Sequence, residues 1–350
     1  MIQIRADGNS QIGAGHIMRC LSVAMALKKL GEEVCFVLAD ESCRDLVESR
    51  GYRVHVLGTD YRQMEGELDS YFSFLKHRKP AGILVDSYFV TEKYLNKLRE
   101  ITKVAYLDDM FERVYPVDII INYGICAEEL PYKEKYPRTT KCLLGPYYAP
   151  VRQEFQDREI RFHEALTDVL ITTGGSDAYN LAGGILQEAL QDEYAKTLKY
   201  HVVSGAFNTH LKELQKLEKN YSNVTVYSNV KRMSDIMLQC DVALTAGGST
   251  VLELSALGIP FLCFSFVDNQ EPGVQALVKK DLTAYGGNYL TEKERMIKDL
   301  IRNLKLLGQN NSLRNKYARK IRECIDGNGA MHIAQEILES LLETPKTLLE

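Results

Sequence analysis

The sequence predicts an α/β protein of two doubly wound, Rossmann-like domains whose parallel sheets face each other across a cleft. Two observations predict this fold. Short apolar runs without polar alternation are separated by stretches of helical periodicity, the pattern of parallel strands covered by helices on both faces. The pattern restarts at residue 168, and a chain of 350 residues is long enough for two cores.

The first domain is predicted over residues 1–150. Apolar runs indicate strands near 2–6, 33–38, 52–57, 82–86, 103–107, 118–122 and 141–144. Helical stretches near 16–30, 41–50, 60–77 and 91–101 lie between the earlier strands. The first helix is the clearest, because Ile17, Leu21 and Ala24 recur at close to 3.6 residues per turn.

The second domain is predicted over residues 151–342, after a joint near 146–164, and residues 343–350 are expected to form a loose tail. Strands are expected at 168–175, 198–205, 223–228, 241–248 and 259–266. Helices are expected from Asn180, near 208–219, at 232–239, from Ser249, from Gln270 and over most of 291–342.

Composition excludes several classes of partner. A net charge of −4 and a pI of about 6.1 argue against nucleic acid and acidic membranes. No apolar run approaches the roughly 18 residues that span a bilayer, and the N-terminus lacks the pattern of a secretory signal. Eight cysteines form no C-x-x-C pair, which favours reduced, packing thiols. We therefore expect a cytoplasmic protein, and we predict a monomer without a cofactor.

The segment Asp7–Arg19, DGNSQIGAGHIMR, predicts a functional loop between the first strand and the first helix. Gly13 and Gly15 give a glycine-punctuated turn into a helix, where backbone N–H groups and the helix dipole favour an anion. The same dipole favours a neutral imidazole at His16, which can accept a proton. His16 is thus a candidate general base.

Two other interpretations of this loop stay open. His16 is also consistent with a helix-start residue bonded to backbone, the glycines serving only the turn. Gly13-x-Gly15, with Asp40 ending the next strand, invites a dinucleotide-binding interpretation. Met18 opposes it, because that fingerprint needs a very small residue at the third glycine position.

Two similar turns in the second domain favour a phosphorylated ligand. Strand, glycine pair, hydroxyl residue and helix follow one another in ITTGGSDAYN and in LTAGGSTVLE. The residues concerned are Gly174, Gly175 and Ser176 in the first turn and Gly247, Gly248 and Ser249 in the second. Each turn allows close backbone approach, with a hydroxyl N-cap expected to follow. Glu253, one helical turn later, is placed either to bind a ribose diol or to serve as a first-turn acid.

These segments carry a resemblance to a known family. TAGGSTVLELSALGIP followed by FVDNQ resembles the nucleotide-binding half of GT-B glycosyltransferases, notably the enzyme that makes lipid II. The whole chain resembles the UDP-2,4-diacetamido-2,4,6-trideoxy-β-L-altropyranose hydrolases of pseudaminic acid biosynthesis, and related spore-coat polysaccharide proteins. The matching segments are R-x-D-x-x-x-Q-I-G-x-G-H-x-x-R at Arg5–Arg19, VDSYFV with Asp86 and Tyr88, LDD with Asp108 and Asp109, GPYYAPVRQEF and DNQ.

The resemblance implies roles for individual residues. The second glycine turn would face the diphosphate and Glu253 would hold the uridine ribose. Tyr88 matches a family tyrosine near the reacting sugar, and Asn269 matches a family amide next to the diphosphate or sugar; both are catalytic candidates together with His16. Gln270, next to Asn269, is a candidate for binding substrate. Arg152 matches a substrate-contacting arginine. The implied reaction, without metal, is hydrolysis of a UDP-linked diacetamido-trideoxyhexose with inversion, releasing the free sugar for pseudaminic acid synthesis and flagellin glycosylation.

Elementary chemistry agrees with that reaction, because UDP is a good leaving group and one base that activates water suffices. Arg19, on the same helix face as His16, would steer phosphate, orient a carboxylate or form a surface ion pair. Asp108 and Asp109 would bind Mg²⁺, orient His16 or cap a turn. Three other functions stay open: a glycosyltransferase with a UDP-sugar donor, a hydrolase of a different nucleotide sugar, and a nucleotide-sugar-binding protein without catalysis.

Overall fold

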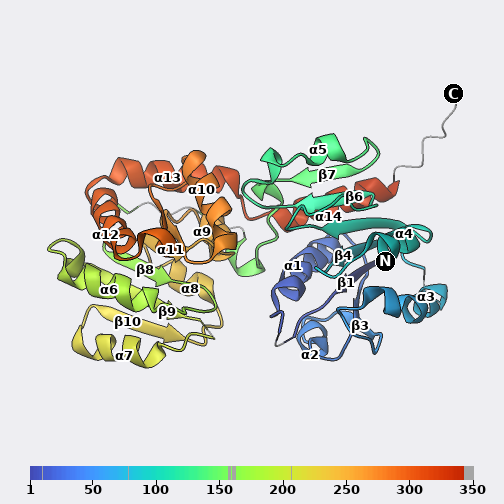
Figure 1. Ribbon diagram of the computed structural model, residues 1–350, viewed down its shortest axis with the longest axis horizontal. Helices are drawn as coiled ribbons and strands as arrows, with labels where there is room; N and C mark the ends of the chain where they lie inside the picture. The colour runs from blue at the N-terminus through green and yellow to red at the C-terminus, as the bar shows by residue number, and fades with distance from the viewer. Residues whose placement is uncertain (10, 78, 157–158, 160–162, 206, 343–350) are drawn as a thin grey trace. The chain divides into compact units, whose positions relative to one another are not determined.

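The computed structural model describes residues 1–350 except 10, 78, 157–158, 160–162, 206 and 343–350 (Figure 1). Two compact units make up the chain. The first comprises Met1–Arg152 together with the chain from Asn328 onward, and the second comprises Gln153–Gly327. The predicted tail, 343–350, lies outside the described residues.

The first unit is built on a parallel sheet of seven strands in the order β3-β2-β1-β4-β5-β6-β7. Its strands are β1 Ile2–Ala6, β2 Val34–Leu38, β3 Arg53–Val56, β4 Gly82–Asp86, β5 Lys103–Leu107, β6 Ile119–Asn122 and β7 Lys141–Leu144. Its helices are α1 Gly15–Lys29, α2 Arg44–Glu48, α3 Leu68–His77, α4 Glu92–Arg99, α5 Tyr132–Lys135 and α14 Gly329–Leu342, with 3-10 turns η1 Met64–Glu67, η2 Ala127–Glu129 and η3 Pro146–Tyr148.

The second unit has a parallel sheet of six strands in the order β10-β9-β8-β11-β12-β13. Its strands are β8 Asp168–Thr172, β9 Lys199–Ser204, β10 Val224–Ser228, β11 Val242–Ala246, β12 Phe261–Ser265 and β13 Gly286–Asn288. Its helices are α6 Leu181–Gln191, α7 Leu211–Asn220, α8 Met233–Met237, α9 Thr250–Leu257, α10 Glu271–Lys279, α11 Tyr289–Glu292, α12 Glu294–Gln309 and α13 Asn311–Cys324, with 3-10 turns η4 Gln153–Phe155, η5 Ala195–Thr197 and η6 Asp268–Gln270.

Two doubly wound sheets confirm the predicted fold class. In each sheet the strand order reverses beside the first strand of the unit, between β1 and β4 and between β8 and β11. Loops after such neighbouring strands diverge, and the resulting crevice at the carboxyl edge is where ligands bind in this class of fold. The topology therefore directs attention to the loops after β1 and β4 and after β8 and β11.

Helix α14 corrects the predicted domain boundary. Residues up to 342 are predicted to belong to the second domain, but α14 packs against α1 in the first unit (Figure 1). Ala330, Ile333 and Ala334 share one core cluster with α1 residues, including Leu27. Periodicity predicts an amphipathic helix here, but it does not specify which apolar surface the helix covers.

Strand β13 and the short helix α5 lie outside the predicted elements, and β13 shows why. It reads Gly-Gly-Asn and pairs with the edge of β12. Such a segment has no apolar pattern, and glycine and asparagine are poor strand formers, so only pairing with β12 makes it a strand.

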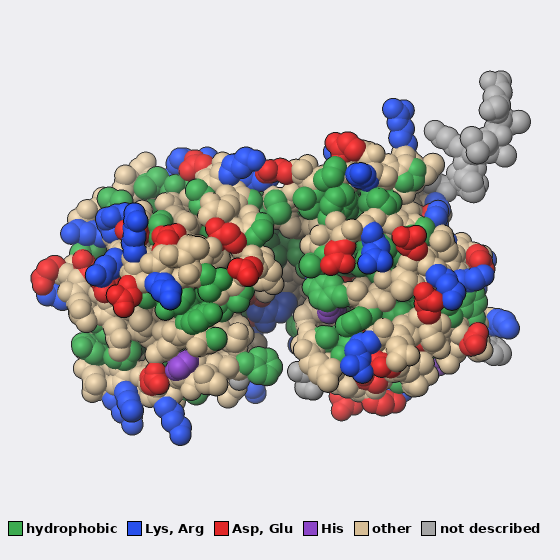
Figure 2. Space-filling view, viewed as in Figure 1, with side chains coloured by type: hydrophobic (Ala, Val, Ile, Leu, Met, Phe, Trp, Pro, Cys, Tyr) green, Lys and Arg blue, Asp and Glu red, His purple; other side chains and the backbone are tan. Residues whose placement is uncertain are grey.

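Among the described residues, no helix combines the length and hydropathy needed to cross a bilayer. Figure 2 shows acidic and basic side chains interspersed on the visible face of each unit, so no broad basic patch lies on that face.

A buried ion cluster links β1 to the segment after β3. Arg5 is fully buried; its Nη1 donates to Asp7 at 2.6 Å, and its Nε and Nη2 donate to Glu67 at 2.7 and 2.6 Å. Tyr94 also donates its hydroxyl to Glu67. Burial alone would lower the pKa of Arg5, but the two carboxylates and Tyr94 hold it well above its ordinary value.

We predict that Glu67→Ala lowers the free energy of unfolding by about 3–5 kcal/mol, because it leaves the buried Arg5 charge short of a partner. Urea unfolding followed by circular dichroism measures this loss. Glu65→Ala is the matched control, since Glu65 pairs with exposed Lys93 at the surface, and its unfolding midpoint should hardly move. Equal effects of the two changes would contradict the importance of the buried cluster.

Candidate active site

Four neighbouring strands bring the candidate residues of the first unit together. The register places Ala6 of β1 beside Asp86 of β4, and β5 and β6 follow in the sheet. Helix α1 begins directly after the loop from β1, and Asp109 and Tyr123 follow β5 and β6. Because carboxyl ends of parallel strands meet at one edge, loops far apart in sequence meet here.

His16 binds a buried carboxylate. Its Nδ1 lies 2.6 Å from Oδ1 of Asp86, and both side chains are buried. A contact this short requires a hydrogen between the two atoms, so Nδ1–H donates to Asp86. In the neutral ring Nε2 is then the unprotonated nitrogen, and within the described chain it has no hydrogen-bond partner. The pairing suits His16 to accept a proton at Nε2.

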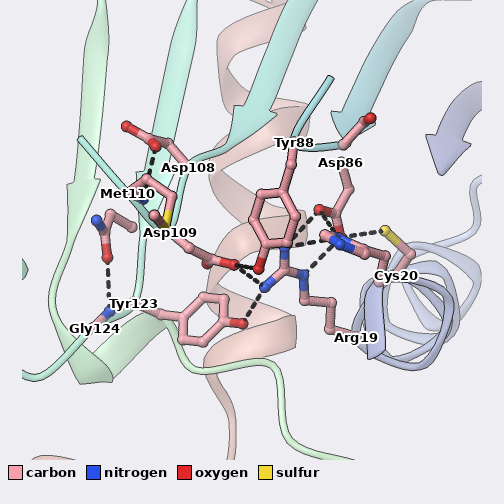
Figure 3. Close-up of polar contacts among 12 residues, drawn as sticks. Arg19, Cys20, Asp86, Tyr88, Asp108, Asp109, Met110, Tyr123 and Gly124 are labelled. Atoms are coloured by element: carbon pink, nitrogen blue, oxygen red, sulfur yellow. Dashed lines mark hydrogen bonds and ion pairs between the residues drawn. The ribbon is translucent and has the colours of Figure 1, made fainter. Parts of the chain in front are cut away.

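Arg19 also binds Asp86, beside His16 (Figure 3). Its Nε and Nη2 donate to the two oxygens of Asp86, each at 2.6 Å, and its Nη1 donates to Asp109 at 2.7 Å and to the hydroxyl of Tyr123. Burial would raise the pKa of Asp86, but the charge and hydrogen bonds of Arg19, with those of His16, hold it well below its ordinary value. Of the roles predicted for Arg19, the structure places it as the residue that orients a carboxylate.

Tyr88 lies over the imidazole at the surface of the unit. Its ring meets the His16 ring edge-on, with 4.6 Å between centroids, and its hydroxyl donates to Asp109 at 2.9 Å. Burial and the neighbouring Asp109 raise the pKa of Tyr88, so the phenol stays protonated at neutral pH. The side chain is 53% exposed, so a ligand can reach it beside His16.

The two acids after β5 have different roles. Asp108 caps the following turn: its Oδ1 accepts from the backbone N–H groups of Met110 and Phe111, and its Oδ2 accepts from Tyr132. Asp109 instead links Arg19 and Tyr88. The described residues contain no group of three or more metal-ligating side chains. The turn-capping alternative therefore applies to Asp108, and Asp109 acts on His16 only through its neighbours.

The glycine loop before α1 is shaped by local bonds. Asn9 and Gly13 exchange backbone hydrogen bonds, and Gly13 has φ of +71°, a conformation that favours glycine. Gly15 opens α1, whose first turn carries no acidic residue and no side-chain cap. The N–H groups of this turn suit an oxygen ligand, so an anion at Gly13 and Gly15 stays a prediction.

The second unit corrects the prediction of hydroxyl caps. Asp177 caps α6, its two oxygens accepting from Leu181 N at 2.7 Å and Ala182 N at 2.9 Å, so Ser176 does not cap this helix. Ser249 precedes α9 with helical backbone angles and makes no cap hydrogen bond. A hydroxyl cap needs an extended backbone at that position to reach the next N–H groups. The start of α6 is thus occupied by the chain's own carboxylate, and the start of α9 carries no side-chain cap.

The remaining candidates of the second unit follow adjacent strands. Exposed Gly175 and Ser176 come after β8, and exposed Gly248 and Ser249 come after β11. Asn269 is exposed and Gln270 half-buried in η6, which follows β12. These loops leave the same carboxyl edge, since β8, β11 and β12 are neighbours. The side-chain oxygen of Gln270 accepts from Phe266 N, which fixes this turn.

Glu253, Gly174 and Arg152 complete the predicted set. Glu253 is half-buried in the first turn of α9, and Gly174, with φ of +85°, turns the chain after β8. Arg152 is half-buried and is the last residue of the first unit before the boundary. Their ligand contacts stay predictions.

The role of Asp86 as the partner of His16 is not predicted from the sequence. The sequence prediction includes Asp86 only as part of the Asp-x-Tyr segment and gives it no role. A signal was available, because an acid at the last position of a strand is well placed to meet a histidine that follows a neighbouring strand.

Comparisons with known proteins show which proteins the chain resembles. Residues 169–337 match the model described as the glycosyltransferase family 28 C-terminal domain. The chain is 27% identical over 281 residues to the UDP-2,4-diacetamido-2,4,6-trideoxy-beta-L-altropyranose hydrolase of Campylobacter jejuni, which covers 80% of this chain and 96% of that protein. It is 28% identical over 276 residues to an uncharacterized protein of Methanocaldococcus jannaschii, covering 74% of this chain and about half, 54%, of that relative.

Solved structures identify the fold. The crystal structure of MurG from Acinetobacter baumannii aligns with a TM-score of 0.69 over 97% of this chain and 99% of that chain, at 14% identity. The chain therefore has the GT-B fold, and residues 169–337 match the glycosyltransferase family 28 C-terminal domain. The resemblance drawn from the sequence is confirmed.

We predict that Asp86→Asn changes the tautomer of His16. An amide can donate to Nδ1, which would move the ring proton to Nε2 and remove the acceptor; ¹⁵N NMR of the histidine ring distinguishes the two forms. The matched control is Asp109→Asn, because Asp109 bonds Arg19 and Tyr88 but not His16. A His16 tautomer that is the same in the wild type and in Asp86→Asn would refute this role of Asp86.

Proposed function

We propose that this protein is a hydrolase of UDP-linked sugars in which His16 activates the attacking water. The observation that carries the proposal is the buried contact of His16 Nδ1 with Asp86, which leaves Nε2 as a proton acceptor. The similarity to the Campylobacter hydrolase, over almost all of that protein's length, supports the same reaction class.

The proposed mechanism needs one base. Water gives a proton to His16 Nε2 while its oxygen bonds to the anomeric carbon, and the bond from that carbon to the diphosphate oxygen breaks with its electron pair leaving on UDP. Asp86 stabilises the imidazolium that forms. Because the diphosphate delocalises the negative charge, no acid need protonate the leaving group, unlike the carboxyl pair of ordinary glycosidases. Attack opposite UDP inverts the anomeric centre.

The charges of the two units favour different parts of the substrate. In the first unit one guanidinium, Arg19, faces two carboxylates, Asp86 and Asp109, which disfavours a diphosphate there. In the second unit the start of α9 lacks a side-chain cap and follows an exposed glycine, which favours phosphate oxygens. We therefore assign the diphosphate to Gly248 and Ser249, the ribose to Glu253, and contacts to the rest of the substrate to Asn269, Gln270 and Arg152.

The particular substrate that we propose rests on the sequence resemblance. We propose UDP-2,4-diacetamido-2,4,6-trideoxy-β-L-altropyranose as the substrate and the free sugar as a precursor of pseudaminic acid, with the protein acting in the cytoplasm as a monomer.

A glycosyltransferase is the second candidate, favoured by the family 28 domain and by the likeness to MurG. The same base would then deprotonate an acceptor hydroxyl instead of water. Release of free sugar from a UDP-sugar in the absence of acceptor separates the two functions.

We expect the wild type, given a panel of UDP-sugars without acceptor, to release UDP and reducing sugar from the diacetamido substrate, with activity that survives EDTA. In H₂¹⁸O the label should enter the sugar and not UDP, because the C–O bond breaks. His16→Ala should reduce turnover by roughly 10²–10⁴-fold with UDP affinity nearly unchanged. Label in UDP, or near-normal turnover of the variant, would overturn the mechanism; transfer only to an added acceptor would favour the glycosyltransferase.

Glu253→Ala tests the nucleotide site separately from the chemistry. A carboxylate that binds the ribose diol gains about 1.5–3 kcal/mol per hydrogen bond, so calorimetry should show UDP binding weakened by about ten- to a hundredfold. The wild type should bind 2′-deoxy-UDP less tightly than UDP, and the variant should bind the two alike. Independent penalties from the mutation and the missing hydroxyl would make Glu253 only a first-turn acid of α9.

A further inference from the structure

A small cavity adjoins His16 inside the first unit. It offers room for about one water molecule, far less than the roughly 300–1,000 Å³ of a site that takes a whole small ligand. Four of the residues that line it carry polar side chains and are each at most 6% exposed: Asp7, His16, Asp86 and Ser87. Such a space suits a single solvent molecule.

The residues at the rim of the cavity are aromatic and more exposed than the residues at its buried end. Tyr88 and Phe89 also line the cavity, and they are 53% and 36% exposed. Aromatic rings at the rim suit the faces of a sugar, whereas buried carboxylates suit a hydrogen-bond donor such as water. In an inverting reaction the water lies beyond the sugar, on the side away from UDP. The aromatic residues at the rim therefore suit the sugar, and the buried polar side chains suit the water.

Asp7 has acceptor capacity that the fold does not use. Its Oδ1 accepts from Ala39 N at 2.8 Å and its Oδ2 accepts from Arg5 Nη1 at 2.6 Å. An ionised carboxylate offers about four acceptor positions, so each oxygen retains capacity for another donor. Asp86, by contrast, already accepts four hydrogens, from His16, twice from Arg19 and from the thiol of Cys20. Of the two carboxylates on the wall, Asp7 is the one able to bind a further hydrogen.

We propose that Asp7 holds the attacking water together with His16. The inference rests on the proposed hydrolase function and deepens it. One water hydrogen is donated to His16 Nε2 and transferred there during attack; the other is donated to Asp7 and stays on the oxygen, which bonds to the anomeric carbon as UDP leaves. Asp7 takes no proton. It fixes the orientation of the oxygen lone pair, and its partner Arg5 fixes Asp7.

Methanol distinguishes this role from a structural one, because it carries a single hydroxyl hydrogen. Methanol can donate to His16, but its methyl group then replaces the hydrogen that Asp7 would accept. The wild type should therefore favour water strongly over methanol. A variant without the Asp7 carboxylate should lose that preference, whatever its overall activity.

The experiment measures free sugar and methyl glycoside formed from UDP-2,4-diacetamido-2,4,6-trideoxy-β-L-altropyranose at a fixed methanol concentration. We expect Asp7→Asn to reduce hydrolysis by about 10- to 100-fold, the value of a hydrogen bond to a charged group, and to raise the ratio of methyl glycoside to free sugar by a similar factor. Glu67→Gln is the matched control, since it also removes a carboxylate from Arg5 but does not line the cavity. Its ratio should equal that of the wild type.

Each result of this experiment either supports or overturns the role of Asp7. If Asp7→Asn does not fold, Asp7→Glu keeps the charge, displaces the carboxylate by one methylene and should still raise the ratio. An unchanged ratio in a folded, active Asp7 variant would overturn the proposal while leaving the hydrolase function intact, and so would an equal rise in Glu67→Gln. A wild type that releases neither UDP nor sugar would overturn the hydrolase function and this inference with it.

Discussion

The candidate site depends on one buried charge, the carboxylate of Asp86. An ionised carboxylate at 1% exposure is costly unless its oxygens are fully bonded. Arg19 supplies the opposite charge in a two-pronged contact and His16 supplies a further hydrogen. The need to satisfy Asp86 therefore fixes the positions of both α1 side chains. The same bonds that compensate the buried charge also fix the proton on His16 Nδ1.

Strand β1 joins this site to the core of the first unit. Arg5 lies on β1 and is held by Glu67 on one side and by Asp7 on the other, while the loop after β1 leads to His16. Buried polar clusters of this kind allow few alternative arrangements, because each member left unsatisfied is penalised. The polar cluster around β1 therefore fixes the start of the segment that leads to His16.

The two glycine turns of the second unit show how one sequence pattern yields different surfaces. Both have a glycine pair followed by serine, yet α6 begins under the carboxylate of Asp177 and α9 begins without a side-chain cap. An acid directly after the serine makes the difference: the backbone of residues 177–180 turns so that Asp177 reaches two N–H groups. The positive end of α6 is neutralised internally, whereas that of α9 remains able to attract an anion.

The sequence by itself determined the strand and helix alternation, the two parallel sheets and the glycine loop that carries His16, and its resemblance to a known family added Tyr88 to the same site. The alternation and the loop are local features, because apolar periodicity and glycine turns act over a few neighbouring residues. Only the tertiary structure decided that α14 completes the first unit, that Asp86 binds His16, that Asp108 caps a turn while Asp109 contacts Arg19, and that Asp177 replaces Ser176 as a cap. Those outcomes depend on which strand ends become neighbours and on which buried group lacks a partner, and pairing between residues 70 or 90 positions apart leaves no periodic trace in a single sequence.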